Sequence, residues 1–212
     1  WNRRFGRAGH YIPYGGEPHP APPPLDGLRA GEYVLLVARF VPENTVGEFL
    51  EAAGTLSADH PVVLVGSTGW GGDLDDTAAG LARTHPSIRW LGHVADEATL
   101  NGLYANAGVY FHGHSVGGTN PSLVQAMASG APIVARDTVY NREVLGETGV
   151  YCAPEPRAIE AAIRAVMADP DARSRMGRDN QLRAQSFFTW EAVCAAYESV
   201  LRMALTERGR PR

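Results

Sequence analysis

Apolar residues in most of this chain fall into short continuous runs that alternate with segments of helical spacing. In residues 46–53, for example, Val46, Phe49, Leu50 and Ala53 share one face of a helix. Continuous apolar runs of four to six residues are typical of strands buried on both faces of a parallel sheet. Six short runs are predicted as strands: residues 33–38, 61–65, 88–91, 109–112, 132–135 and 150–152.

Helical segments separate these strands and also follow the last one. They are predicted at residues 46–53, 74–82, 100–107, 121–129, 141–145, 159–166 and 193–204. Regular alternation of strand and helix indicates an α/β, Rossmann-like parallel sheet of about six strands with helices on both faces. Ligands of such sheets bind at the carboxyl ends of the strands. The loops of interest are therefore residues 39–45, 66–73, 92–95, 113–120 and 136–141.

Residues 1–31 have a different character. They are rich in proline, with glycine beside it at Gly15 and Gly16, which is typical of a linker or an extended segment. The short run at residues 11–14 is compatible with a strand or a sheet edge. We therefore divide the chain into a linker, residues 1–31, and a folded domain with a helical tail, residues 32–212.

Composition narrows the function. The chain has 212 residues, 44% of them hydrophobic, and a formal net charge of −4, which argues against a nucleic-acid-binding surface. The apolar runs are too short to span a bilayer, and we expect a cytoplasmic location. The two cysteines show no zinc or disulfide pattern. The chain begins at Trp1 without an initiator methionine, and we expect it to be a fragment.

The loop at residues 113–120 is the strongest candidate for chemistry, because it follows a strand and opens a helix. Asn120 suits the N-cap and a proline follows it, while Gly117 and Gly118 permit close approach to a ligand. The N–H groups of Ser122 and Leu123, and that of the residue after them, would then face the loop at the positive end of the helix dipole, as in phosphate sites. A plain capped helix after a glycine-rich turn is an equally good interpretation of these residues alone.

The same region carries a family resemblance. Residues 113–135 resemble the donor-site signature of retaining GT-B glycosyltransferases that build bacterial surface polysaccharides. Within that run, His-Ser-Val-Gly-Gly-Thr-Asn-Pro-Ser at residues 114–122 is similar to the capsule rhamnosyltransferases. Residues 37–44, 90–94 and 141–146 resemble further segments of the family in the family's order, so the resemblance covers about residues 11–205.

The resemblance implies the C-terminal, donor-binding half of a glycosyltransferase. The donor would be a nucleoside diphosphate sugar, with dTDP-L-rhamnose favoured, and transfer would retain configuration without a metal or other cofactor. The acceptor, a lipid-linked or surface glycan, would bind an N-terminal domain outside this chain, so the fragment alone would be inactive. Residues 1–31 would be the inter-domain connection, and the last helix would pack toward the missing half. The enzyme could be peripheral at the inner face of the membrane.

Two residues are the candidate catalytic groups. Arg39 follows the first strand, where its planar guanidinium can bind the diphosphate. The bland alternative for Arg39 is an exposed charge at a strand end. His114 begins the anion loop and can hydrogen-bond the sugar or the leaving phosphate. The family's second cation lies five positions after the arginine, and this chain has Asn44 there.

The family also has two glutamates eight positions apart, which contact the donor sugar and the ribose, and this chain has Gly117 and Gln125 at those positions. Gln125 can still hydrogen-bond a ribose hydroxyl. Thr119 could contribute to the diphosphate site together with Asn120. Four further residues are candidate donor contacts by position in the family, the last two through backbone groups that read the base: Gly66, Ser67, His93 and Val94.

Other interpretations follow from the histidines and from the positions at which this chain departs from the family pattern. His112 and His114 would point to one side of an extended strand, but no third metal ligand lies nearby, so we expect no metal site and a core role for His112. The departures at Asn44, Gly117 and Gln125 fit a non-catalytic nucleotide-binding module. A Rossmann oxidoreductase is a third possibility, disfavoured because the dinucleotide fingerprint is missing.

Overall fold

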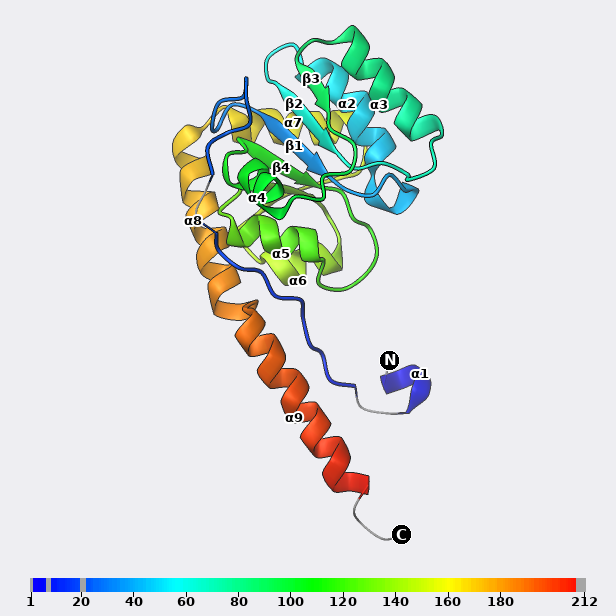
Figure 1. Ribbon diagram of the computed structural model, residues 1–212, viewed down its shortest axis with the longest axis vertical. Helices are drawn as coiled ribbons and strands as arrows, with labels where there is room; N and C mark the ends of the chain where they lie inside the picture. The colour runs from blue at the N-terminus through cyan, green and yellow to red at the C-terminus, as the bar shows by residue number, and fades with distance from the viewer. Residues whose placement is uncertain (1, 7–8, 20–21, 209–212) are drawn as a thin grey trace.

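A six-stranded parallel sheet forms the centre of the molecule (Figure 1). The computed structural model describes residues 2–6, 9–19 and 22–208. The strands are β1 (Val34–Val37), β2 (Val62–Val65), β3 (Ile88–Trp90), β4 (Val109–His112), β5 (Ile133–Arg136) and β6 (Val150–Cys152). Their order is β3-β2-β1-β4-β5-β6, and every neighbouring pair is parallel. The predicted fold class and all six predicted strands are confirmed.

The strands are apolar throughout because both faces of the sheet are covered. In β1, Val34 and Leu36 belong to one hydrophobic cluster and Leu35 belongs to another. This alternation follows from the two-residue period of a strand. The parallel register places Leu35 opposite Val63 of β2 on one side and Tyr110 of β4 on the other. Each face of the sheet therefore supplies its own half of the core.

Helices divide between the two faces (Figure 1). A short 3-10 helix, η1 (Pro42–Asn44), leads into α2 (Val46–Leu56), which packs on one face with α3 (Asp73–Thr84) and α7 (Pro156–Met167). The other face is covered by α4 (Glu97–Ala105), α5 (Pro121–Ala128), α6 (Val139–Leu145) and α8 (Pro170–Phe187). The predicted helices are confirmed, and α8 is an additional helix that the apolar spacing did not indicate.

The strand order creates a switch point between β1 and β4. From β1 the chain moves outward through β2 and β3, and it then returns to place β4 on the other side of β1. The connections after β1 and β4 consequently leave the sheet in opposite directions, which opens a crevice at the carboxyl ends of these two strands.

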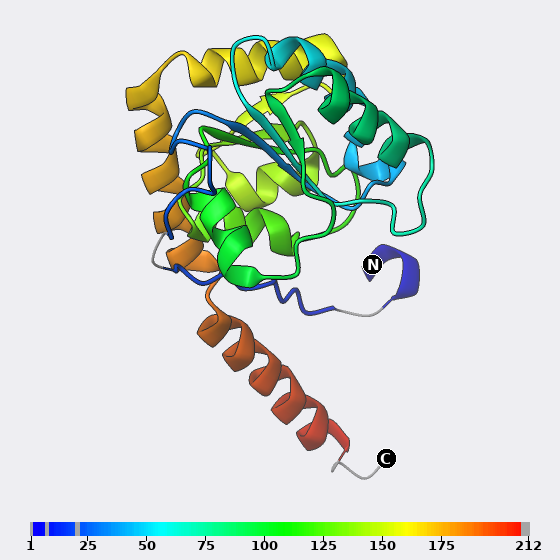
Figure 2. The ribbon, with the colours of Figure 1, turned by 45° about the horizontal axis from the view of Figure 1, so that its top comes forward.

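The two ends of the described chain leave the body of the domain. Helix α9 (Trp190–Arg208) projects away from the sheet (Figure 2), and its residues Tyr197, Leu201 and Leu205 are exposed. At the other end α1 (Asn2–Phe5) is followed by an extended segment, and residues 11–14 form no strand, contrary to one expectation. Among the described residues, no helix combines the length and apolarity that crossing a membrane requires.

Gly66 directly follows β2, at the point where the chain passes against the turn after β1. This close approach offers a first test of the fold. Its φ is +124°, and a Cβ added there would lie 1.8 Å from the carbonyl oxygen of Ala38. Gly66→Ala is expected to lower the free energy of unfolding by more than Gly69→Ala, the matched control. Gly69 also has a positive φ, +89°, but nothing within 4 Å of an added Cβ.

Left-handed strain alone should cost Gly69→Ala about 1–3 kcal/mol. Gly66→Ala must in addition displace main chain, which should raise its loss above the control by a further ~1–3 kcal/mol. Urea denaturation of both variants measures the difference. Equal losses would show that the approach of β2 to the β1 turn is not tight in solution.

Candidate functional site at the switch point

A cavity of about 570 Å³ lies at the switch point. It is lined from the loop after β1 by Arg39, Glu43 and Asn44, among others, and from the loop after β4 and the start of α5 by residues that include His114 and Ser122. Asn120 also lines it. The structure thus brings together five of the predicted site residues, from segments about 75 positions apart in the sequence, namely Arg39, Asn44, His114, Asn120 and Ser122.

Arg39 supplies the positive charge of this cavity. Its neighbours Ala38 and Phe40 are buried, while Arg39 itself is exposed and makes no ion pair within the described part of the chain. The backbone carbonyl of Arg39 accepts hydrogen bonds from Asn44 Nδ2 at 2.8 Å and from the N–H of Val41 at 2.9 Å. Asn44 is itself buried. Its side-chain N–H is therefore used to hold the loop that presents Arg39.

Thr45 joins the two loops of the cavity. Its hydroxyl donates to the carbonyl of Gly113 at 2.5 Å and accepts from Arg136 Nη1 at 3.0 Å. Thr45 is the one non-glycine residue with positive φ in the part of the chain described, with φ 56° and ψ 32°. For a β-branched residue this is a strained conformation. The loop after β4 approaches so closely that a Cβ on Gly113 would lie 2.3 Å from the carbonyl oxygen of Asn44.

Two further hydrogen bonds fix the start of the loop after β4. The N–H of Ser115 donates to the carbonyl of Glu43 at 2.8 Å. Asn141, the third residue of α6, donates from Nδ2 to the carbonyls of His114 at 3.0 Å and Arg136 at 2.8 Å. The backbone at residues 113–115 is thus attached to η1 on one side and to α6 on the other.

The N-terminus of α5 differs in detail from the prediction. Asn120 is the N-cap as expected, and its Oδ1 accepts from the N–H of Ser122 at 2.9 Å. The N–H of Val124 donates to the carbonyl of Asn120 at 3.1 Å. Of the three N–H groups predicted to face the loop unpaired, only that of Leu123 has no partner among the described residues, while its side chain is in the core. The end of the helix dipole remains at the cavity.

The two histidines of this region form a stacked pair. The rings of His112 and His114 lie 4.4 Å apart and are nearly parallel, at 7°. His112 is fully buried, and its Nδ1 is 2.9 Å from the hydroxyl of Tyr110. Burial holds the pKa of His112 well below its usual range. His114 lines the cavity, and burial, reinforced by the charge of Arg39, lowers its pKa to about 4. Both rings are therefore neutral at pH 7.

Two predicted contacts, Thr119 and Gln125, are engaged by the N-terminal segment. The hydroxyls of Tyr11 and Thr119 are hydrogen-bonded. Gln125 Nε2 donates to the carbonyl of Glu17 at 3.0 Å and to Asn101 Oδ1 at 3.0 Å, and Gln125 Oε1 accepts from the N–H of Glu17 at 3.3 Å. Gln125 also borders a second cavity of about 370 Å³ between the N-terminal segment, α4 and α5.

The remaining predicted residues do not line the switch-point cavity. Gly66 is tied into the sheet, since its N–H donates to the carbonyl of Gly92 and its own carbonyl accepts from Trp90 Nε1. The others lie on the connections after β2, β3 and β4, at Ser67, His93, Val94, Gly117 and Gly118. Four residues that organise the site, Glu43, Thr45, Arg136 and Tyr11, were not predicted as site residues. Three of them lie in loops that the strand pattern marked as of interest, and Glu43 also lies in the family-like segment 37–44, but nothing in the sequence assigned a role to any of the four.

Among the described residues, no group of three or more histidine, cysteine, aspartate or glutamate side chains is placed to hold a metal ion.

The neutral histidine pair predicts a pH dependence of stability. In the unfolded chain His114 titrates near its ordinary value of 6.5, whereas in the folded chain its pKa is about 4. Between these values the unfolded state binds the extra proton, so stability must fall as pH is lowered through this window and rise as pH increases. His112 contributes with the same sign.

Denaturant midpoints measured from pH 7 to pH 5 test this expectation. His114→Asn should flatten the decline, and His10→Asn, which removes an exposed ring, should leave it as in the unaltered chain. An equally steep decline in His114→Asn would show that His114 is not the group responsible.

Known proteins resemble this chain over most of its length. Glycogen synthase of Mycobacterium tuberculosis is 30% identical in an alignment 195 residues long, which covers 84% of this chain and 44% of that protein. O-antigen chain mannosyltransferase B of Escherichia coli is 27% identical in an alignment 164 residues long, which covers 75% of this chain and 42% of that protein. A D-rhamnosyltransferase of Pseudomonas aeruginosa is 28% identical in an alignment 136 residues long, which covers 62% of this chain and 35% of that protein. The chain spans less than half the length of these relatives.

Solved structures share the fold. Sucrose-phosphate synthase from Thermosynechococcus elongatus superposes with a TM-score of 0.77 at 23% identity, over 97% of this chain and 56% of that one. Anabaena HepE in complex with UDP-glucose superposes with a TM-score of 0.68 at 18% identity, over 82% of this chain and 48% of that one.

A family profile described as glycosyl transferases group 1 matches residues 31–169, which include β1 to β6 and the whole switch-point cavity. That match covers well over half of the chain. The chain therefore belongs to the group 1 glycosyl transferases, and the domain built on its six-stranded sheet is of the GT-B type.

Proposed function

We propose that this domain binds the nucleoside diphosphate sugar of a glycosyl transfer, with the diphosphate in the switch-point cavity. The observation that supports this most directly is the meeting of three groups on one cavity. They are the guanidinium of Arg39, which forms no ion pair with a described residue, the neutral ring of His114 and the N-terminus of α5. A cation and a helix N-terminus favour an anion. A neutral imidazole can donate a hydrogen bond without requiring a counter-ion.

During transfer the bond between the anomeric carbon and a diphosphate oxygen breaks. The anomeric carbon bonds to the acceptor hydroxyl oxygen, and the proton of that hydroxyl passes to the departing diphosphate. Negative charge therefore grows on the departing diphosphate, where Arg39 and the dipole of α5 stabilise it. His114 adds a neutral hydrogen bond to the same group. We propose that the transfer retains configuration and needs no metal, on the basis of the resemblance at residues 113–135.

Glu43 orients the donor in this proposal. It is the one carboxylate among the residues that line the cavity, and it makes no ion pair with Arg39 or another residue in the described ranges. A carboxylate repels a diphosphate but accepts hydrogen bonds from hydroxyl groups. The diphosphate then lies toward Arg39 and α5, and the sugar hydroxyls lie toward Glu43.

The relatives support a donor of this class without fixing its identity. The HepE structures contain UDP or UDP-glucose, and the curated relatives are named for glucan, mannosyl and D-rhamnosyl products. The loop at residues 114–122 favours dTDP-L-rhamnose. We propose that a domain outside this chain binds a lipid-linked or glycan acceptor, so that the present chain binds donor but does not transfer it alone.

A non-catalytic nucleotide-binding module is the second candidate. It is favoured by the engagement of Asn44 and Gln125, whose side-chain N–H groups bond within the chain. The two candidates differ in turnover by the longer protein with a lipid-linked acceptor, since a module would bind nucleotide without transferring sugar.

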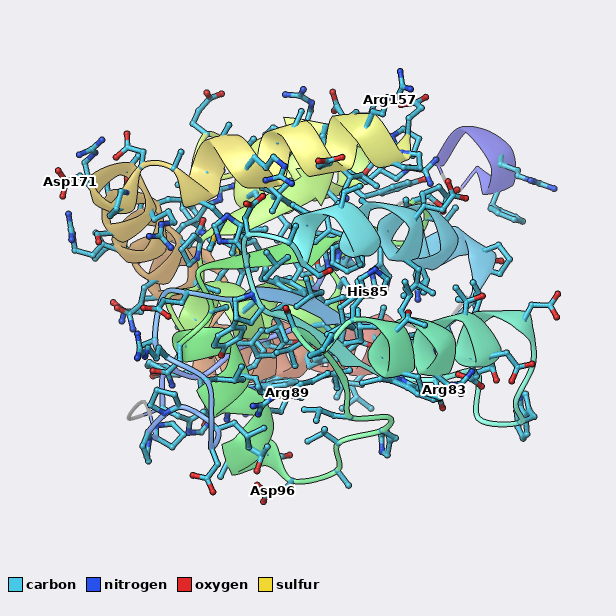
Figure 3. The ribbon with its side chains drawn as sticks, turned by 90° about the horizontal axis from the view of Figure 1, so that it is seen from above. Arg83, His85, Arg89, Asp96, Arg157 and Asp171 are labelled. Atoms are coloured by element: carbon cyan, nitrogen blue, oxygen red, sulfur yellow. The ribbon has the colours of Figure 1, made fainter. Side chains whose placement is uncertain are left out.

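Calorimetric titration with UDP, dTDP, GDP and NAD tests the binding itself. One nucleoside diphosphate should bind, and Arg39→Ala should weaken it by about 1–3 kcal/mol, the contribution of a charged hydrogen bond. Arg157→Ala is the matched control, because Arg157 projects from α7 on the outer surface (Figure 3). Binding of NAD alone, or an equal loss in both variants, would contradict the proposal.

A comparison of sugar-bearing and sugar-free ligands tests the role of Glu43. Glu43→Gln should lower the affinity for UDP-glucose or dTDP-L-rhamnose, whichever binds, by about tenfold, because the substitution removes the charge from one hydrogen bond to the sugar. The same change should leave the affinity for the corresponding free diphosphate unaltered or slightly stronger. Glu51→Gln, at an exposed position of α2, is the control. Equal loss for both ligands would place Glu43 outside the sugar site.

A further inference from the structure

The N-terminal strap, defined here as residues 9–19, lies against the loop after β4, residues 113–120, although the two segments are about 100 residues apart in the sequence. Figure 1 shows this segment in blue beside α5. Near its end, the N–H of Gly16 donates to the carbonyl of Phe188 at 2.8 Å, next to the start of α9. A Cβ on Gly15 would lie 2.7 Å from the Trp190 ring, and one on Gly16 would lie 2.9 Å from the carbonyl of Val124. The strap is therefore closely fitted at this point.

Two contacts connect the strap to α5 and the loop that leads into it. Tyr11 and Thr119 are joined through their hydroxyls, 108 positions apart. The backbone of Glu17 both donates to and accepts from the side-chain amide of Gln125. Thr119 is buried and directly precedes the N-cap Asn120. The strap thus holds the loop where it enters α5, and it holds α5 itself at Gln125.

The loop has little else to hold it between its ends. Its beginning is attached through the N–H of Ser115 to the carbonyl of Glu43. Gly117 and Gly118 are exposed, and an added Cβ on either would meet nothing within 4 Å. Glycines in open space have the largest conformational entropy to lose on ordering. The hydroxyl pair of Tyr11 and Thr119 is consequently the side-chain contact, among described residues, that joins the far end of this loop to a distant part of the chain.

We propose that Tyr11 is a positioning residue for the donor site, which acts by holding Thr119 and thereby ordering residues 116–118 before ligand arrives. The inference rests on the proposed function for its ligand, but the ordering itself is a property of the unliganded chain. Preorganisation strengthens binding because less entropy is lost on association. The segment that precedes the sheet thereby sets the affinity of the cavity.

Hydrogen exchange on the unliganded chain is the first test. Tyr11→Phe removes only the hydroxyl, and Thr119→Val removes the partner while keeping its shape. The amides of Ser115 and Ser122, whose N–H groups are hydrogen-bonded at the two ends of this loop, should exchange about three- to tenfold faster in each variant, as expected for the loss of one neutral hydrogen bond. The double variant should exchange no faster than the single ones. Tyr14→Phe, an exposed tyrosine of the same strap, is the matched control.

Nucleotide affinity is the second test, made with whichever of UDP, dTDP and GDP binds the unaltered chain most tightly. Tyr11→Phe and Thr119→Val should each weaken it by about three- to tenfold. Thr119→Ser, which keeps the hydroxyl, should restore most of the affinity. A purely structural contact would lower the unfolding midpoint without this rescue, so the midpoint of each variant is measured alongside.

The outcomes separate the two proposals. Unchanged exchange in Tyr11→Phe and Thr119→Val would overturn the positioning role, whatever the chain binds. Faster exchange with unchanged affinity would also overturn it, because loop order would then not contribute to binding. Failure of all three nucleotides to bind the unaltered chain would contradict the proposed function, and the exchange result would still decide whether the strap orders the loop.

Discussion

The hydrogen bond from the Thr45 hydroxyl to the Gly113 carbonyl is the contact on which the candidate site depends. Strands β1 and β4 are neighbours, but their connections diverge, so the sheet by itself leaves the two loops apart. Thr45 joins them, and Arg136 at the end of β5 fixes the rotamer of its hydroxyl. A left-handed threonine costs about 1–3 kcal/mol, which the surrounding contacts must offset. Such strain persists where structure around it leaves no alternative.

Local patterns in the sequence were sufficient for the six strands and for most of the helices. Each strand is buried on both faces, so its apolar run was visible without knowledge of its partners, and the Asn120-Pro121 pair marked the start of α5. Helix α8 was missed for a physical reason. Its buried residues are Gly177, Asn180 and Ala184, which pack through small size and a hydrogen bond from Asn180 to the carbonyl of Ala131 rather than through an apolar stripe.

The site was predictable only where it follows strand ends. Arg39 and His114 come directly after β1 and β4, and strand order brings them together at one cavity. The contacts of Thr45 and Tyr11 could not be predicted, because each joins residues 68 or more positions apart and neither residue type is characteristic of its role. Prediction of Gln125 as a ribose contact rested on its family position alone, and the structure adds that its amide already has partners in the chain.

Asn44 and Gln125 are uncharged amides at two positions where the resembled family carries charged side chains. A carboxamide both donates and accepts, so Gln125 can bond to both backbone groups of Glu17, which a glutamate could satisfy only in part, while Asn44 donates to the carbonyl of Arg39 without adding a charge. Asn44 holds the loop of Arg39, and Gln125 holds the strap. With fewer fixed charges in the cavity, less of the binding energy can come from Coulombic attraction, and more must come from groups already held in place. The dense bonding of the loops around Arg39 and His114 is what such a site requires.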